Sequence, residues 1–457
     1  MSVGTGLSGL SAVAAAREIR EGRLSCVDYT RALLAVVDAR EDRVQAWEWL
    51  DREQALAVAR ALDEAIARGD AAGPLLGVPV GIKDIIDVRG MPTGDGTPLH
   101  AGRIATDDAA LVARLRRAGA WPLGKTVTTE LATYAAGKTR NPHDVAHTPG
   151  GSSSGSAAAV ACGMVPLAIG TQTNGSVIRP ASFCGVVGYK ASFGRIARGG
   201  VLRQSPSLDQ IGVFARDVDD AAVLAEALFG SDPSDAATLC APTPPLAALA
   251  SSEPPVRPRL AWVRTPWWQR VAPDAKRAFT RWVEGLGESI EAVELPGEAA
   301  DAVAWQRTVM EADIAASYAR EYDTGREQLS ESLQRQIERG RTITAVDYRG
   351  AIERRERVSA ALEPLFDEYD AIACPATLGI APLASEGTGD PLMCTLWTYL
   401  GVPALSLPLL RGAKDLPLGV QLVGGYGDDA RLLRTARWLL RKPRIPTTPP
   451  DAGTIAE

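Results

Sequence analysis

Short apolar runs rich in β-branched residues alternate along the chain with amphipathic helical segments, and this alternation restricts the fold more than any other feature of the sequence. Glycines interrupt or end many of these runs, as is typical of buried strands that lead into tight turns. Helical segments such as 106–119 separate the apolar runs, which lie at 73–90, 164–171, 259–263, 370–376 and 416–425. The pattern predicts an α/β fold, in which helices cover a central β-sheet.

The composition is that of an ordinary globular protein, and it excludes several other classes. Hydrophobic residues make up 46% of the 457 residues and charged residues 23%, so the chain is neither disordered nor fibrous. The formal net charge is −6, and no block of Lys and Arg resembles a nucleic-acid-binding surface. The sequence shows no secretory signal and no apolar run of membrane-spanning length. We therefore expect a cytoplasmic protein with no nucleic-acid or membrane partner.

The pattern of residues changes along the chain. The first seventy residues predict three helices, the second of which begins at a capping pair, Ser25 and Asp28. Residues 241–259 are rich in Pro, Ala and Ser and are typical of a surface connection. Residues 300–368 are helical in pattern almost throughout, which predicts a helical elaboration of the sheet. The six cysteines are scattered without a CxxC, so we expect buried thiols and no metal site.

Two short motifs suggest familiar chemistry, but the sequence around each argues against it. The segment GAWPLGKT at 119–126 matches a nucleotide-binding P-loop. A helical pattern precedes it, and Trp121-Pro122 occupies positions whose backbone N–H groups should contact phosphate, so a P-loop protein is kept only as a remote alternative. The segment GSSSG at 151–155 matches the nucleophile elbow of α/β-hydrolases, which requires a later histidine. All three histidines precede Ser153.

Without a suitably placed histidine, a lysine is the remaining candidate for a base that activates a serine. Lys83 lies within the apolar segment GVPVGIKDII, and burial lowers the pKa of a lysine because it disfavours the charged form. Alternation along an extended strand points the adjacent Asp84 the opposite way. The run GGSSSGSAAAVA at 150–161 supplies serines, whose hydroxyl groups can both accept and donate a proton. These serines are candidates for a relay between a nucleophile and Lys83.

Taken in order, several segments of the chain resemble the amidase signature family. The segments are GVPVGIKDIID, GKTVTTELA, NPHDVAHTPGGSSSGSAAAVA, GTQTNGSVIRPASFCGVVGYK and SLDQIGVFAR, and ACPAT and GVPALSLP continue the match. The resemblance implies that family's α/β fold, a mixed, twisted β-sheet covered by helices on both faces. It also implies one domain over 1–457, with a signature core at about 70–216, a variable helical elaboration at about 241–368 and a C-terminal return to the core at about 369–445.

The resemblance implies a Ser–cis-Ser–Lys triad that needs no metal and no organic cofactor. In the family pattern, Ser176 matches the nucleophile, Ser152 the bridging serine that follows a cis peptide bond, and Lys83 the base. The oxyanion hole matches the backbone N–H groups of Thr173, Asn174, Gly175 and Ser176.

The nucleophile loop departs from the commonest form of the family motif. Gln172 replaces an aspartate, Asn174 replaces a glycine, and Arg179 stands three residues after the nucleophile. A TQT-x-GSVIRP variant is found within the family, so the catalytic assignment is kept. Arg179 suits two roles, binding a carboxylate or carbonyl of the substrate or making structural contacts. Tyr134 and Trp397 belong to an apolar-aromatic set that suits either a substrate pocket or the core.

We therefore expect a hydrolase that cleaves C–N bonds of small-molecule amides through a seryl acyl-enzyme. The resemblance extends this expectation to aryl amides and carbamates (urethanes), which are among the family's substrates. The alternative is the amide-hydrolysing component of a glutamine-dependent tRNA amidotransferase, which works with partner subunits. The adjacent Trp267 and Trp268 are typical of either a surface cluster or a contact between the two copies of a homodimer.

Overall fold

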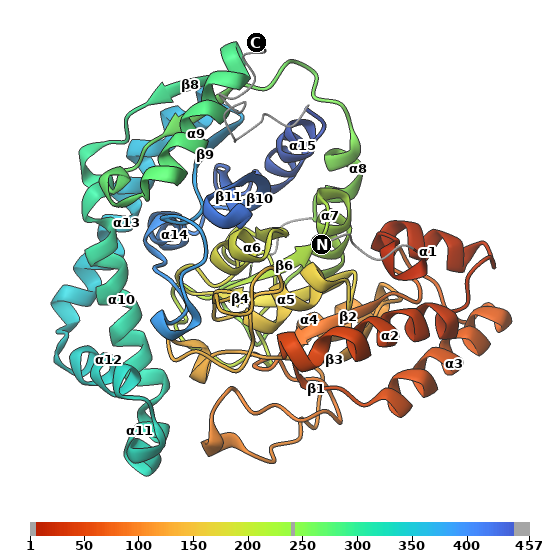
Figure 1. Cartoon of the computed structure of the whole chain (residues 1–457). Helices are drawn as coiled ribbons and strands as arrows, with labels where there is room; N and C mark the ends of the chain where they lie inside the picture. The colour runs from red at the N-terminus through yellow and green to blue at the C-terminus, as the bar shows by residue number, and fades with distance from the viewer. Residues whose placement is uncertain (1–5, 239–242, 443–457) are drawn as a thin grey trace, which may run out of the picture.

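A single mixed β-sheet organises the chain, and the computed structural model describes residues 6–238 and 243–442 of it (Figure 1). In spatial order the sheet consists of β1 (Trp47–Trp49), β3 (Trp121–Thr126), β2 (Pro79–Lys83), β4 (Leu167–Gln172), β6 (Gln210–Ala215), β5 (Val187–Lys190), β10 (Ala404–Arg411), β11 (Pro417–Val423), β9 (Ala371–Pro375), β7 (Leu260–Val263) and β8 (Ile290–Val293). Strand β2 runs parallel to both of its neighbours, β3 and β4, whereas the strands from β4 to β9 pair antiparallel. The predicted mixed α/β sheet is thus confirmed.

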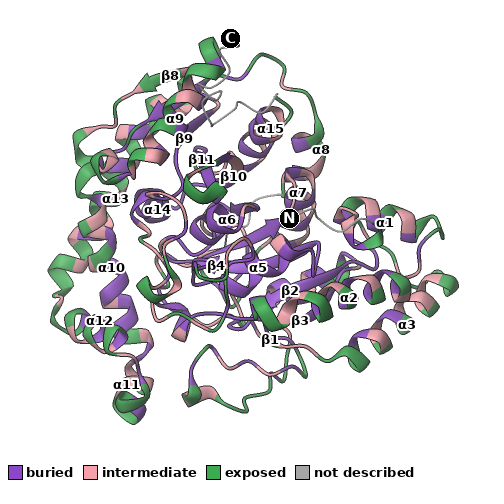
Figure 2. Cartoon of the chain, in the orientation of Figure 1, coloured by how far each residue is buried: buried purple, intermediate pink, exposed green. Residues whose placement is uncertain are grey.

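Helices cover both faces of the central strands, because these strands are apolar on both sides. Every residue of β2, β4 and β6 is buried, and Figure 2 shows exposed residues on the outer helices, the loops and the edge strand β8. On one face pack α2 (Cys26–Val44), α5 (Ser154–Cys162) and α6 (Ile178–Cys184). On the other pack α4 (Ala110–Arg117), α7 (Val218–Leu228) and α15 (Asp429–Leu440).

The N-terminal region forms the three predicted helices, α1 (Ala12–Arg20), α2 and α3 (Arg52–Arg68). Ser25 caps α2 by accepting a hydrogen bond from the Asp28 N–H at 2.9 Å, as the capping pair predicts. The predicted helical elaboration is also present beside the sheet, as α10 (Ala302–Ser317), α11 (Ala319–Gly325), α12 (Glu331–Thr342) and α13 (Ala345–Glu368), which Figure 1 shows on the side opposite α1–α3.

The prediction of a plain surface connection at 241–259 is corrected in part. This stretch contains α8 (Leu246–Ser251), which packs against α7 and α15 because Leu246 and Ala250 are apolar and fully buried. The remaining helices are α9 (Pro273–Leu286) and α14 (Leu392–Leu400). Five cysteines are buried and free as predicted, and Cys240 lies outside the described residues. Over the described ranges, no helix is long and apolar enough to cross a membrane.

Close packing of α5 against the sheet predicts that Gly155 tolerates no side chain. An added Cβ would overlap the backbone oxygen of Ala46 and the backbone nitrogen of Val127, neither of which can move independently. We expect Gly155→Ala to lower the free energy of unfolding by at least about 2 kcal/mol, measured by urea denaturation. Gly297→Ala is the control, since a Cβ there meets no atom, and it should change stability by less than about 0.5 kcal/mol. Equal stability of the two variants would contradict the packing argument.

Candidate active site

Lys83 is the last residue of β2, and it points into a wholly buried polar cluster. Its Nζ donates hydrogen bonds to Ser152 Oγ at 2.7 Å and to Thr171 Oγ1 at 2.8 Å. The side chain is 0% exposed, and this burial lowers the pKa of Lys83 to about 7, although the negative charge of Asp209 acts in the opposite direction. A substantial fraction of Lys83 is therefore neutral near pH 7 and able to accept a proton.

Ser152 is the member of the serine run that meets Lys83. The Gly151–Ser152 peptide bond is cis, as expected. The other serines contact backbone: Ser153 Oγ donates to the Thr171 carbonyl at 3.2 Å, and Ser154 Oγ donates to the Val127 carbonyl at 3.2 Å. The run is therefore not a flexible linker, since it ties the start of α5 to neighbouring strands and leaves one hydroxyl for the lysine.

Ser176 lies in the short turn between β4 and α6 and is buried, with 8% of its surface exposed. Its hydroxyl has no hydrogen-bond partner in the part of the chain that the structure describes, so it is free to turn toward Ser152 or a substrate. The backbone N–H groups of residues 173–176 likewise donate to no acceptor within the described ranges. Unpaired N–H groups beside a free hydroxyl are the donors that an oxyanion hole requires.

Side chains hold this turn open in place of backbone hydrogen bonds. Gln172 Oε1 accepts from the N–H groups of Val177 and Ile178 at 2.8 and 3.0 Å, which caps the start of α6. Gln172 Nε2 donates to Thr398 Oγ1 at 2.9 Å, and Thr398 Oγ1 donates to the Asn174 carbonyl at 2.5 Å. Gln172 thus accepts two backbone hydrogen bonds, as a carboxylate there could, and it also donates one to α14.

A second set of contacts fixes Thr173. Its hydroxyl lies 2.6 Å from Asp209 Oδ1 and 3.0 Å from Gln204 Oε1. Asp209 Oδ2 accepts from the N–H groups of Gln204 and Ser205, both at 2.9 Å, and burial raises the pKa of Asp209 to about 6. The Thr173 carbonyl accepts from Gln306 Nε2 at 3.2 Å, so the helical elaboration also reaches the loop.

The candidate substrate-binding residues fall in different environments. Tyr134 lines a cavity of about 290 Å³ together with Asn174, Met310 and Thr395. The Asn174 side chain spans this cavity wall, donating to Tyr134 Oη at 3.3 Å and accepting from Thr395 Oγ1 at 2.7 Å. Trp397, 1% exposed, packs in the hydrophobic core beneath and does not line this cavity.

Arg179 is 1% exposed and makes structural contacts close to the triad. Its Nη2 donates to the Gly151 carbonyl at 2.7 Å and to Thr388 Oγ1 at 3.3 Å. The Nε and Nη1 atoms have no acceptor in the described chain, and burial lowers the pKa of Arg179. The contact to Gly151 matches the structural role considered for this arginine, and the two unused donors leave it able to bind a substrate oxygen.

The P-loop motif forms no loop. Residues Trp121 to Thr126 are strand β3, and Lys125 Nζ is ion-paired with Asp84 at 2.8 Å in the core. Asp84 thus points away from Lys83, as strand alternation predicts. Among the described residues, no group of three or more His, Cys, Asp or Glu side chains is arranged to hold a metal ion.

Sequence reasoning missed the residues that hold the nucleophile turn. Thr171, Gln204, Asp209, Gln306, Thr395 and Thr398 all contact it or the lysine. Asp209 lies in SLDQIGVFAR, one of the segments that resemble the family, and nothing else in the sequence marks it as part of the site. Thr395 and Thr398 lie three positions apart on one face of α14, between apolar and aromatic residues, and no sequence pattern distinguishes them from core residues.

The chain is similar to known proteins over most of its length. The Amidase family model matches residues 28–433. A curated relative, the A component of the glutamyl-tRNA(Gln) amidotransferase of Chloroflexus aggregans, is 34% identical over 489 residues, covering 96% of this chain and 99% of the relative. The solved peptide amidase of Stenotrophomonas maltophilia has a TM-score of 0.82 at 29% identity, covering 96% of this chain and 98% of its own. A chain from a vestigial complex bearing on the origins of an s-triazine catabolic enzyme has a TM-score of 0.88 at 28% identity, covering 96% and 100%.

The lowered pKa of Lys83 predicts how the reactivity of Ser176 depends on pH. A fluorophosphonate should label Ser176 once, at a rate that rises with pH through about 7, because the neutral lysine can take a proton and the charged one cannot. Mass spectrometry gives the site, and the Ser176→Ala variant should stay unlabelled. A flat rate between about pH 5 and pH 9 would exclude Lys83 as the base.

Proposed function

Since the chain belongs to the amidase family, we propose that it hydrolyses amide C–N bonds through an acyl-enzyme formed on Ser176. The observation that supports this most is the 2.7 Å hydrogen bond from Lys83 Nζ to Ser152 Oγ at a fully buried lysine. The other two fully buried lysines of the described chain have different partners: Lys125 is paired with Asp84, and Lys190 donates to Gln210 Oε1 and to the carbonyl groups of Ala191 and Val402. Lys83 contacts only hydroxyl groups among the described residues, which suits a proton acceptor.

In this mechanism, neutral Lys83 takes the hydroxyl proton of Ser152, and Ser152 takes the proton of Ser176 as Ser176 Oγ attacks the substrate carbonyl carbon. The free N–H groups of Thr173 to Ser176 stabilise the negative charge that develops on the carbonyl oxygen. The proton then returns through Ser152 to the departing nitrogen, and the C–N bond breaks. Water attacks the acyl-enzyme by the same route, which releases the acid and restores Ser176.

The curated relative favours one particular amide, the side-chain amide of glutamine. That relative is named as one component of a glutamyl-tRNA(Gln) amidotransferase, and the alignment covers nearly the whole of both chains. In this role the chain would release ammonia from glutamine in a complex with partner subunits. On the comparisons alone, this amidotransferase role is better supported than the hydrolysis of aryl amides or carbamates.

A stand-alone amidase is the second candidate, and a structural neighbour and the cavity beside Asn174 favour it. The solved neighbour is named as a peptide amidase and not as a component of a larger complex. The cavity of about 290 Å³ has an apolar-aromatic part, formed by Tyr134, Trp267, Met310 and Leu392, that suits a hydrophobic acyl group. Its other lining residues include charged ones, Arg270, Arg307 and Asp390. Aryl amides and carbamates belong to this candidate.

Two serines in the same run provide a matched test of the triad. Ser152→Ala removes the relay and should lower kcat for a short-chain acyl 4-nitroanilide at least about a hundredfold, with little change in KM. Ser154→Ala removes only the hydrogen bond to the Val127 carbonyl and should keep kcat within about threefold. The absorbance of released 4-nitroaniline gives both rates. Equal losses in the two variants would mean that Ser152 has no special role.

The two candidate functions differ in the product that the purified chain should release without partner subunits, ammonia from glutamine or an aniline from an aryl substrate. We would compare ammonia release from glutamine with aniline release from an aryl amide and an aryl carbamate that share one leaving group, using Ser176→Ala as the blank. Turnover of either aryl substrate by the purified chain identifies a stand-alone enzyme, and the faster of the two gives its class. Glutamine hydrolysis, or no turnover without partner subunits, supports the amidotransferase role.

A further inference from the structure

A second cavity lies on the side of the nucleophile turn that faces Lys83. It has a volume of about 250 Å³, and its wall includes Thr171, whose Oγ1 contacts Lys83 Nζ, and Thr173, the first residue of the turn. The cavity beside Asn174 does not share these two threonines. The two cavities therefore flank the turn, one next to Thr173 and one next to Asn174.

The direction of proton transfer indicates which cavity would hold the amine half of a substrate and which the acyl half. In the proposed reaction the proton returns through Lys83 and Ser152 to the departing nitrogen, so that nitrogen must face the lysine. The amine half of the substrate then extends toward Thr171 and Thr173, and the acyl half toward Asn174 and Tyr134. A volume of about 250 Å³ is smaller than a typical pocket for a whole ligand and suits one part of a substrate.

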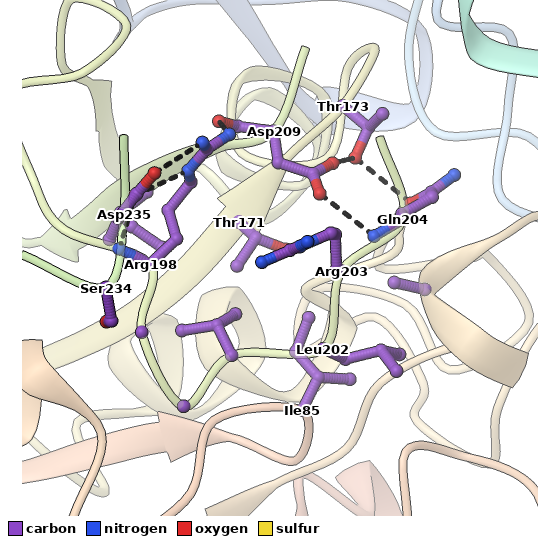
Figure 3. A pocket seen from close by; sticks show the side chains of 15 residues that line it. Ile85, Thr171, Thr173, Arg198, Leu202, Arg203, Gln204, Asp209, Ser234 and Asp235 are labelled. Atoms are coloured by element: carbon purple, nitrogen blue, oxygen red, sulfur yellow. Dashed lines mark hydrogen bonds and ion pairs between the residues drawn. The ribbon is translucent and has the colours of Figure 1, made fainter. Parts of the chain in front are cut away.

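Most of the charged groups that line this cavity are already paired. Arg198 binds Asp235 through two hydrogen bonds, Nε to Oδ2 at 2.9 Å and Nη2 to Oδ1 at 2.8 Å. The carboxylate of Asp209 accepts from Thr173 and from two backbone N–H groups. Figure 3 shows the interactions of Arg198 with Asp235 and of Asp209 with Thr173 and Gln204 among the residues that line the cavity.

Arg203 is the exception. Its side chain extends into the middle of the lining residues, and no dashed interaction reaches it (Figure 3). Within the described ranges, the guanidinium has no hydrogen-bond or ion-pair partner. Arg203 is exposed, so water can solvate it, and the lining balances two arginines with two aspartates. The cavity thus presents a guanidinium that no described side chain occupies, and its planar donors match the geometry of a carboxylate.

We propose that this cavity is a subsite for the leaving amine and that Arg203 there binds a carboxylate carried by that amine. The preferred substrates are then amides formed on the nitrogen of an amino acid or aminobenzoate. This rests on the proposed amide hydrolysis and specifies its substrate class. The acyl group passes to Ser176 Oγ as the C–N bond breaks, the nitrogen gains the proton relayed by Ser152, and the amino acid leaves with its carboxylate still on Arg203.

Two anilides with the same short acyl group test the subsite, one releasing 4-aminobenzoate and the other 4-aminoacetophenone. The measured quantity is kcat/KM for the 4-aminobenzoate anilide divided by kcat/KM for the 4-aminoacetophenone anilide. This ratio should fall about tenfold in Arg203→Gln, which corresponds to the loss of one charge-assisted hydrogen bond, and it should recover partly in Arg203→Lys. Comparing ratios between variants removes the electronic difference between the anilides. Arg320→Gln is the control, since Arg320 is an exposed arginine lining only the adjoining larger cavity.

The outcomes separate this subsite from the proposed function. If Arg203→Gln still cleaves the neutral anilide, and the ratio of kcat/KM values falls in that variant alone, the result supports both the subsite and the proposed amide hydrolysis. An unchanged ratio, or an equal fall in Arg320→Gln, overturns the subsite while hydrolysis stands. If neither anilide is cleaved, binding decides: 4-aminobenzoate should bind the Ser176→Ala chain about tenfold more tightly than the Ser176→Ala, Arg203→Gln chain by calorimetry. Equal binding, or none, then overturns the subsite as well.

Discussion

The removal of one lysine from water is the condition on which the rest of the site depends. Two lysines are buried on adjacent strands, and the pleat gives them different partners. Asp84 follows Lys83 in the chain but points to the other side, where it neutralises Lys125 at 2.8 Å. Lys83 is left with hydroxyl groups alone, so its charged form gains little in compensation for lost hydration. One alternation along β2 thus separates a structural lysine from one that is able to act as a base.

The nucleophile turn meets the opposite requirement, since its backbone donors must stay unpaired. Buried N–H groups without acceptors cost free energy, and contacts elsewhere must offset that cost. Gln172, Thr398 and Asp209 supply such contacts from three different elements, and each bonds to the turn through a side chain. The side chains and carbonyl groups of Thr173 and Asn174 are therefore held in place, while the Ser176 hydroxyl and the N–H groups of the turn remain available to a substrate.

The parts of the fold and site that are local in sequence could be predicted, and those that depend on long-range contacts could not. Strand alternation, the helix caps, the apolar segment around Lys83 and the serine run around Ser152 are each encoded within a few residues. Lys83 and Ser152 lie 69 residues apart, and the family resemblance is what related them. Thr398 lies 224 residues from Asn174, and no local pattern links them. Trp397 illustrates the converse: an aromatic residue at helical spacing is more often core than pocket but fits both, and its burial in the structure places it in the core.

The volume on the lysine side of the turn bears on the choice between the two candidate functions. A reaction that releases only ammonia needs a passage there for one small molecule, and a paired or apolar wall would serve. This chain instead has a cavity of about 250 Å³ lined by the guanidinium of Arg203, which has no partner among the described residues. Arg203 is exposed, so water accepts its hydrogen bonds until a ligand takes the place of that water. An amine that carries its own carboxylate would use both the space and this guanidinium, so the proposed subsite, if the anilide experiment supports it, favours the stand-alone enzyme over the release of ammonia alone.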